Sequence, residues 1–302
     1  EREEEEEEET STFAKLRQER MKRRRLEQSQ QELGLSFNSS SSSSSPHNPP
    51  SSSPSDTYLE LLDLVLLPAL RSDLVSRWQP LDPEPVLRWI ELWEALLPPI
   101  FLSNVLAHLV LPRLRTAVQT WNPTKDTVPI HFWIHPWLPY LAAALEELYP
   151  TIRFQLTVAL QSGWHASDAS ALLMLKPWRR VWKGADWEGI LNRAVIPKLV
   201  EALLAAPVVA AAPPGEVFIH WVLPWLSVMS AGMAAGLLVK ALFPSWLAAL
   251  RDWLAGESDL GEVSEWYMTW KAALPDDVAD HEAVRHQFAL AQHMMNAALE
   301  NV

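Results

Sequence analysis

His131 and His135 are the residues of this 302-residue chain whose spacing best suits metal chemistry. At i and i+4, two imidazoles on one helix face can share a metal ion, but neither an H-E-x-x-H sequence nor a third ligand accompanies them. Pro136 directly after His135 instead favours a helix boundary. The chain has no Cys, which excludes disulfides, zinc thiolate sites and cysteine nucleophiles.

The other polar clusters have structural interpretations. Residues 165–170 read His-Ala-Ser-Asp-Ala-Ser and precede an apolar run, a position where Ser and Asp typically cap a helix. Only nine Gly occur, and none forms a phosphate-cradling loop or a nucleophile elbow. We therefore predict that the chain is not an enzyme and binds no cofactor or metal.

Tryptophan marks the elements that organise the chain. Of sixteen Trp, ten occur as W-x-x-x-W pairs whose first members lie 43 to 45 residues apart. An apolar-Pro-x-apolar sequence precedes each pair, and Pro is favoured in the first turn of a helix, so each Pro is expected to restart or kink a helix. The pairs are Trp89/Trp93, Trp133/Trp137, Trp178/Trp182, Trp221/Trp225 and Trp266/Trp270, and the prolines are Pro68, Pro112, Pro150, Pro197 and Pro244.

Each unit is expected to be a helical hairpin whose second helix carries the Trp pair. Residues at i and i+4 share a helix face, so each pair forms a broad apolar ridge that one hairpin cannot cover and stacked hairpins can. The spacing predicts an all-α solenoid of about five HEAT-like helix pairs of roughly 44 residues. We interpret the paired Trp as mostly core, with an exposed recognition ridge as the alternative. A further Trp ends the first helix in four units, at Trp78, Trp121, Trp164 and Trp253.

Residues 1–56 differ in composition from the rest of the chain. Eight Glu among the first ten residues supply much of the net charge of −12, and residues 39–55 are rich in Ser and Pro. We predict a disordered tail over residues 1–56 and an α-helical repeat domain over residues 57–302. A basic run within the tail is interpreted as a nuclear import signal or an anchor onto an acidic partner, with a solvated charged helix as the alternative. The run consists of Lys22, Arg23, Arg24 and Arg25.

Residues 217–239 contain no Asp, Glu, Lys or Arg, and their length would suffice to span a bilayer. The segment also contains Gly232 and Gly236 at the spacing used by paired membrane helices. His220 and Pro224 interrupt it, and it falls in register with the Trp repeat. Because a central helix pair of a solenoid is also apolar all round, we predict a buried helix pair and no membrane partner.

Four stretches carry a resemblance to a known family. Residues 121–138 read WNPTKDTVPIHFWIHPWL, and residues 162–181 contain W-H-x-S-D-A-S followed by L-K-P-W. Residues 196–199 read IPKL, and residues 266–271 read WYMTWK. In this order, over roughly residues 59–300, the chain resembles the tuftelin-interacting protein 11 family in its GCFC (GC-rich sequence DNA-binding factor-like) domain.

The resemblance implies an all-α splicing factor in the nucleus, acting as a protein-binding scaffold in late spliceosome and intron-lariat complex disassembly with a DEAH-box RNA helicase. Family members hold the helicase through a Gly-rich G-patch, which is absent from this sequence, since Gly34 is the only Gly before Gly163. The partners expected for these residues are therefore spliceosomal proteins, with RNA associated indirectly. The acidic balance gives no support for DNA binding. The alternative is a generic nuclear helical-repeat adaptor in a transcription complex or another complex.

Overall fold

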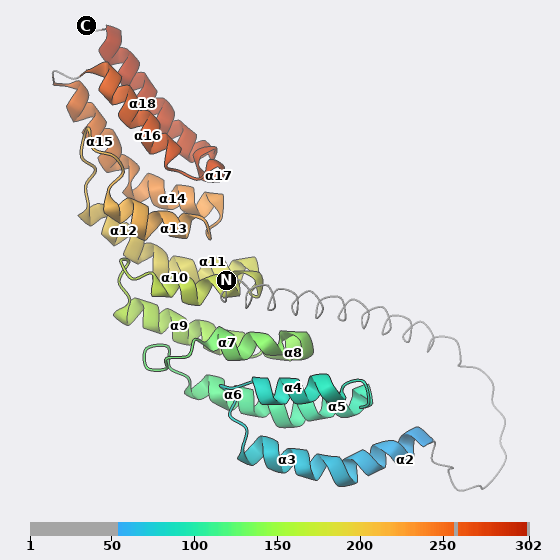
Figure 1. The fold of residues 1–302 in the computed structure, drawn as a ribbon. Helices are drawn as coiled ribbons and strands as arrows, with labels where there is room; N and C mark the ends of the chain where they lie inside the picture. Colours follow the sequence, from blue (N-terminus) through green and yellow to red (C-terminus); the bar gives the residue numbers. More distant parts are fainter. Residues whose placement is uncertain (1–53, 257–258, 301–302) are drawn as a thin grey trace, which may run out of the picture. The chain divides into compact units, whose positions relative to one another are not determined.

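The computed structural model describes residues 54–256 and 259–300, and within these ranges every regular element is a helix (Figure 1). The all-α class is thereby confirmed. The tail predicted over residues 1–56 lies outside the described residues up to residue 53, as do its basic residues Lys22, Arg23, Arg24 and Arg25.

The described chain forms two compact units. Unit 1 comprises the described residues up to Thr120 together with Phe132–Leu148, and unit 2 comprises Trp121–His131 together with the residues from Tyr149 onward. The helices that begin in the first stretch of unit 1 are α2 (Pro54–Leu61), η1 (Leu62–Leu66), α3 (Leu67–Ser76), α4 (Glu84–Trp93), α5 (Pro99–Val105), η2 (Leu106–Val110) and α6 (Leu111–Thr120). They are followed by α7 (Ile130–Ile134), η3 (His135–Trp137) and α8 (Leu138–Leu145).

Unit 2 continues with α9 (Tyr149–Gly163), α10 (Ser170–Leu175), η4 (Lys176–Arg180), α11 (Gly184–Ile190), η5 (Leu191–Val195), α12 (Ile196–Ala205), η6 (Val217–Val222), α13 (Leu223–Leu226), α14 (Ala231–Ala241), α15 (Phe243–Leu254), α16 (Leu260–Ala272), α17 (Asp276–Ala279) and α18 (Glu282–Glu300).

The C-terminal core of unit 2 is aromatic. Trp246 of α15 stacks on Trp266 of α16 with ring centroids 5.1 Å apart, and Phe288 of α18 meets Trp246 edge-on at 5.5 Å. The indole N–H of Trp266 also donates to the backbone oxygen of Ala212 (2.6 Å), which holds the loop between α12 and η6.

Three of the five predicted prolines sit inside continuous helical runs, whereas Pro150 begins α9 after a turn and Pro244 follows the 48° bend between α14 and α15, as predicted. In three places a five-residue π-helical turn leads into a ten-residue α-helix with Pro as its second residue, at Pro68 of α3, Pro112 of α6 and Pro197 of α12. A Pro has no N–H to donate, and its ring clashes with the carbonyl four residues earlier. The wider π turn is a known way to relieve a local conflict inside a helix. The helices therefore pass through Pro68, Pro112 and Pro197, where the sequence predicted a restart or a kink.

The Trp that closes a helix has the same contacts in both units. The indole N–H of Trp78, just after α3, donates to the backbone oxygen of Asp82 (2.8 Å), and that of Trp164, just after α9, donates to the backbone oxygen of Asp168 (2.8 Å). Each ring then meets a paired Trp edge-on, with the same centroid distance of 5.6 Å and the same angle of 67°, in the contacts Trp78–Trp137 and Trp164–Trp225. These Trp thus fix the loops that follow their helices.

Residues 217–239 are divided among η6, α13 and α14. Among the described residues no single helix is both long and apolar enough to cross a bilayer; α14 and α15, bent by 48° at their junction, meet that test only when taken together.

Candidate protein-binding surface

The structure places the ten paired Trp in different environments. Seven of them are buried: Trp133, Trp137, Trp178, Trp182, Trp225, Trp266 and Trp270. Trp89 and Trp221 are half-buried, and Trp93 retains 39% of its surface. The pair on α4 is therefore the one with neither ring fully covered.

The pairs also differ in backbone. Trp89/Trp93 share α4 and Trp266/Trp270 share α16, as predicted for a ridge on one helix face. The other three pairs do not lie on a single regular α-helix, because Pro136, Pro177 and Pro224 stand between or beside their members. Trp133/Trp137 spans α7 and η3, Trp221/Trp225 spans η6 and α13, and Trp178 of η4 is followed by Trp182 in a bend.

One face of α4 carries exposed apolar side chains. Trp89, Leu92, Trp93 and Leu96 follow one another at i, i+3, i+4 and i+7, so they lie along one face of α4 and the turn after it. Leu92 is 71% exposed, and Leu96 is also exposed. The rings of Trp89 and Trp93 stack at 6.4 Å with an angle of 25° between their planes. Stacking keeps both indoles on this face.

A second exposed apolar row lies on α2 and η1. Leu61, Leu64 and Val65 are all exposed, Leu64 by 78%. The hydroxyl of Tyr58 donates to the backbone oxygen of Leu96 (3.2 Å), so the N-terminal part of α2 lies beside the turn that ends α4. The two rows therefore belong to one antiparallel helix pair.

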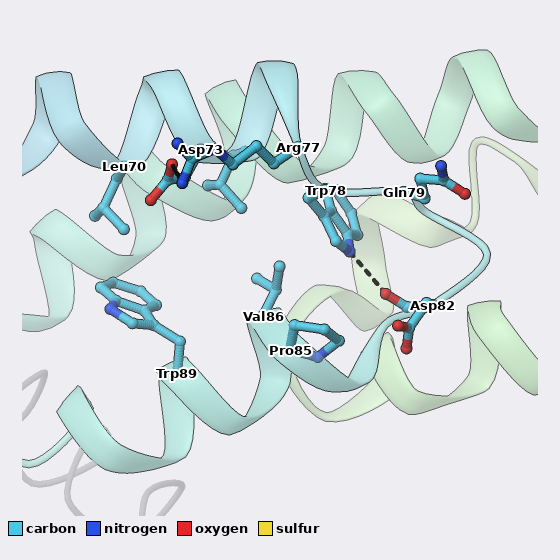
Figure 2. Close-up of a pocket in the computed structure, with 10 residues that line it drawn as sticks. Leu70, Asp73, Arg77, Trp78, Gln79, Asp82, Pro85, Val86 and Trp89 are labelled. Carbon is cyan, nitrogen blue, oxygen red and sulfur yellow. Dashed lines mark hydrogen bonds and ion pairs between the residues drawn. The ribbon is translucent and has the colours of Figure 1, made fainter.

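A groove of about 510 Å³ lies between α3 and α4. Its apolar residues are Leu70, Leu74, Val86, Pro85 and Trp89, and its polar residues are Asp73, Arg77, Gln79 and Asp82, with Trp78 at one end (Figure 2). Asp73 and Arg77 form an exposed ion pair of 3.3 Å. Leu70 and Trp89 face each other at the opposite end from Trp78 (Figure 2).

The helix pair is acidic as well as apolar. Residues 57–97 contain seven carboxylates and three Arg. We call the exposed side chains Leu61, Leu64, Val65, Leu92, Trp93 and Leu96, together with the groove, the hairpin surface. Large exposed apolar side chains on neighbouring helices are a feature of surfaces that bind another polypeptide.

The polar cluster at residues 165–170 forms a local turn. The carboxylate of Asp168 accepts hydrogen bonds from the N–H and the hydroxyl of Ser170 (2.8 Å each), the first residue of α10. His165 Nδ1 lies 2.8 Å from the hydroxyl of Ser167, and the imidazole meets Trp221 edge-on at 5.5 Å. His165 and Trp221 line a pocket of about 340 Å³. These contacts join residues two positions apart and order the start of α10.

Among the described residues no group of three or more His, Asp or Glu side chains is arranged to hold a metal ion. His131 lies in α7 and His135 begins η3, so the two do not share one regular helix. Burial lowers the pKa of His131 below its ordinary value of 6.5.

One feature was missed by sequence reasoning. Lys176, Arg179, Arg180 and Lys183 are all exposed on and just after η4. The sequence K-P-W-R-R-V-W-K contains these four cations, but only its Trp pair was considered, and that pair predicted core packing. Arg179 donates to the backbone oxygen of Ser227 (2.9 Å), so part of this basic turn also has a structural contact.

The described helices define an all-α protein. A family model of GC-rich sequence DNA-binding factor-like proteins matches residues 15–250, and the chain belongs to that family. It is 39% identical over 247 residues to tuftelin-interacting protein 11 of Rattus norvegicus, covering 82% of this chain and 29% of the relative. It is 39% identical over 246 residues to the protein of the same name from Xenopus tropicalis, covering 82% and 30%.

These matches confirm the resemblance seen in the four sequence stretches. The relatives are named as interacting proteins rather than as enzymes. This chain spans about 30% of the length of the curated relatives it matches.

Proposed function

We propose that this chain is the helical, protein-binding platform of a nuclear pre-mRNA splicing factor that acts in late spliceosome and intron-lariat complex disassembly. The observation that carries the proposal is the hairpin surface in a chain related over 82% of its length to tuftelin-interacting protein 11. The surface presents apolar anchors beside carboxylates, a combination suited to a spliceosomal protein with an apolar and basic docking segment.

A solenoid of HEAT-like helix pairs is part of the same proposal. Its support is local: among the described residues a π turn leads into a Pro-containing helix four times, and the helix-closing Trp repeats its contacts in both units. A helical solenoid offers extended surfaces to partners, which is what a scaffold requires.

The partnership with a DEAH-box helicase belongs to the whole protein. This chain has no G-patch, so we assign helicase contact to sequence outside residues 1–302 and RNA association to an indirect route. Residues 57–302 would then anchor the factor on the spliceosome while the remainder recruits the helicase.

The test is affinity purification of the tagged full chain from nuclear extract of its own source. Late spliceosomal proteins are identified by mass spectrometry, and excised intron is detected by amplification across the lariat branch. We expect both to be recovered with the natural chain. We expect both to be strongly reduced with Leu92→Asp/Trp93→Ser, which changes exposed side chains of the hairpin surface.

The matched control is Leu173→Asp/Leu204→Ser, because Leu173 of α10 and Leu204 of α12 are also exposed but lie in unit 2. Equal recovery of late spliceosomal proteins with both variants would show that the hairpin surface is not the surface that binds them. Recovery of a transcription complex without lariat intron would favour a generic nuclear adaptor instead.

A further inference from the structure

The hairpin surface combines features that constrain what can cover it. Leu64 and Leu92 are more than two-thirds exposed, at 78% and 71%, and Glu60 and Asp63 are exposed beside Leu64. The groove volume of about 510 Å³ lies within the range of about 300–1,000 Å³ that is typical of ligand-binding pockets. A segment that satisfies this surface must bring both apolar side chains and positive charge.

Such a segment exists in the same chain. Residues 13–26 contain seven cationic side chains and one Glu, interspersed with the apolar residues Phe13, Leu16, Met21 and Leu26. The family match begins at residue 15, within this segment, and not at α2. The basic segment therefore belongs to the same family region as the helices it precedes.

The intervening sequence is long enough to allow contact. Residues 27–53 join the basic segment to α2. Fully extended, residues 27–53 could span about 90 Å at about 3.3 Å per residue. The continuous helical run from Pro54 to Ser76 is about 35 Å long at about 1.5 Å per residue. The tether is therefore long enough for residues 13–26 to reach this run within one chain.

We propose that residues 13–26 bind the hairpin surface of their own chain, with Phe13 and Leu16 contacting its exposed apolar rows or groove and the cations facing Glu60, Asp63 and Asp73. This contact does not depend on a role in splicing. The basic segment and a partner protein would then compete for the hairpin surface. A partner protein that binds this surface would release Lys22, Arg23, Arg24 and Arg25 for an import receptor.

Zero-length coupling of amines to carboxylates in the full chain tests the proposal. Lys15 and Lys22 are the only lysines before Lys125, so links from the basic segment are identified by mass spectrometry without ambiguity. An equal mixture of unlabelled and ¹⁵N-labelled chain separates links within one chain from links between chains. We expect links within one chain from Lys15 or Lys22 to Glu60, Asp63 or Asp73.

Two variants define the contact. Leu64→Ser/Leu92→Ser removes exposed apolar contacts and should lower the link yield roughly tenfold, since loss of two such contacts weakens binding by about that factor. Arg23→Glu/Arg24→Glu keeps both lysines and should lower the yield by a similar factor, because the attraction becomes repulsion. Leu173→Ser/Leu204→Ser is the matched control and should leave the yield unchanged.

Equal link yields to the exposed Asp276 and Asp277 of α17 would overturn the proposal, because they would show contact without preference. Links found only between labelled and unlabelled chains would also overturn it and would assign the hairpin surface to a second copy. Unchanged yields in Leu64→Ser/Leu92→Ser would show that the apolar rows are not the contact.

Discussion

Trp133 and Trp93 belong to pairs with the same spacing, yet Trp133 is fully buried and Trp93 is 39% exposed. Ile134 and Trp137, which follow Trp133 in unit 1, are also fully buried. A buried indole of this kind stabilises the folded state because it removes a large apolar area from water. It also makes close contacts with neighbours that cannot fill its place if it is removed.

The difference predicts unequal costs of truncation. Trp133→Ala should lower the free energy of unfolding by about 3–5 kcal/mol, because it leaves a large cavity in unit 1. Trp93→Ala should cost less than about 2 kcal/mol, because part of its ring already contacts solvent. Urea unfolding followed by circular dichroism measures both values. Equal losses would show that Trp93 is covered in solution, for which a bound segment is the first explanation to examine.

His131 predicts a pH dependence of stability. Burial lowers the pKa of His131 in the folded chain below its ordinary value of 6.5, so the unfolded chain binds a proton more readily. The stabilising effect of the neutral imidazole is therefore fully present above pH 6.5 and is lost as the pH falls through 6.5 toward the folded-state pKa.

The measurement is the free energy of unfolding of the natural chain and of His131→Gln between pH 7.5 and pH 5.5. We expect the natural chain to lose more stability on acidification than His131→Gln does. His293→Gln, at an exposed position on α18, should behave like the natural chain. Parallel pH profiles of the natural chain and His131→Gln would contradict the assignment of the shift to His131.

At the scale of elements, one Arg ties two helices of unit 1 together. Arg113, next to Pro112 in α6, donates through Nη1 to the backbone oxygen of Val75 (2.5 Å) and through Nη2 to that of Trp78 (2.7 Å). The last carbonyls of an α-helix have no partner within the helix, so the guanidinium supplies donors at the end of α3. Its position on α6 therefore fixes how α6 meets that end.

Arg113→Met should lower the free energy of unfolding by about 1–3 kcal/mol, because one exposed and one part-buried carbonyl lose a charged donor. The control is Arg115→Met on the same helix. Arg115 pairs with Glu147 at 2.7 Å, but both side chains are about half exposed, and exposed ion pairs contribute at most about 1 kcal/mol. Chemical denaturation of both variants makes the comparison. A larger loss from Arg115→Met would reverse our ranking of the two contacts.

At the scale of the whole molecule, charge is distributed in blocks. The first ten residues hold eight Glu, residues 13–26 are basic, and residues 57–97 are acidic again. Alternating blocks along one chain favour contacts between them over contacts within them.

Nuclear accumulation tests the role of the basic run. Replacing Lys22, Arg23, Arg24 and Arg25 with Ala should reduce nuclear accumulation of a fluorescent fusion too large to enter by diffusion, since import receptors recognise clustered positive charge. Replacing four of the glutamates at residues 3–9 with Ala is the control and should leave the distribution unchanged. Nuclear accumulation is measured by fluorescence microscopy. Undiminished accumulation of the Lys22–Arg25 variant would show that this basic run is not the import signal.

Much of the local structure follows from residue type and spacing. Pro68, Pro112 and Pro197 lie in the first turn of their α-helices, and Trp78, Trp121 and Trp164 fall at helix ends, because backbone geometry and turn chemistry act over a few residues. The π turns before these prolines were not predictable, since they arise only when the helix continues on both sides.

The sequence by itself determined that the chain is all-α and which side chains share a helix face, because the helical period of 3.6 residues is a local property. Only the tertiary structure decided that Trp133 is enclosed while Trp89 and Trp93 stay at the surface, and that Leu64 and Leu92 are exposed on one helix pair. The physical reason is that covering a face requires a second element, which comes from a distant part of the chain or from another molecule.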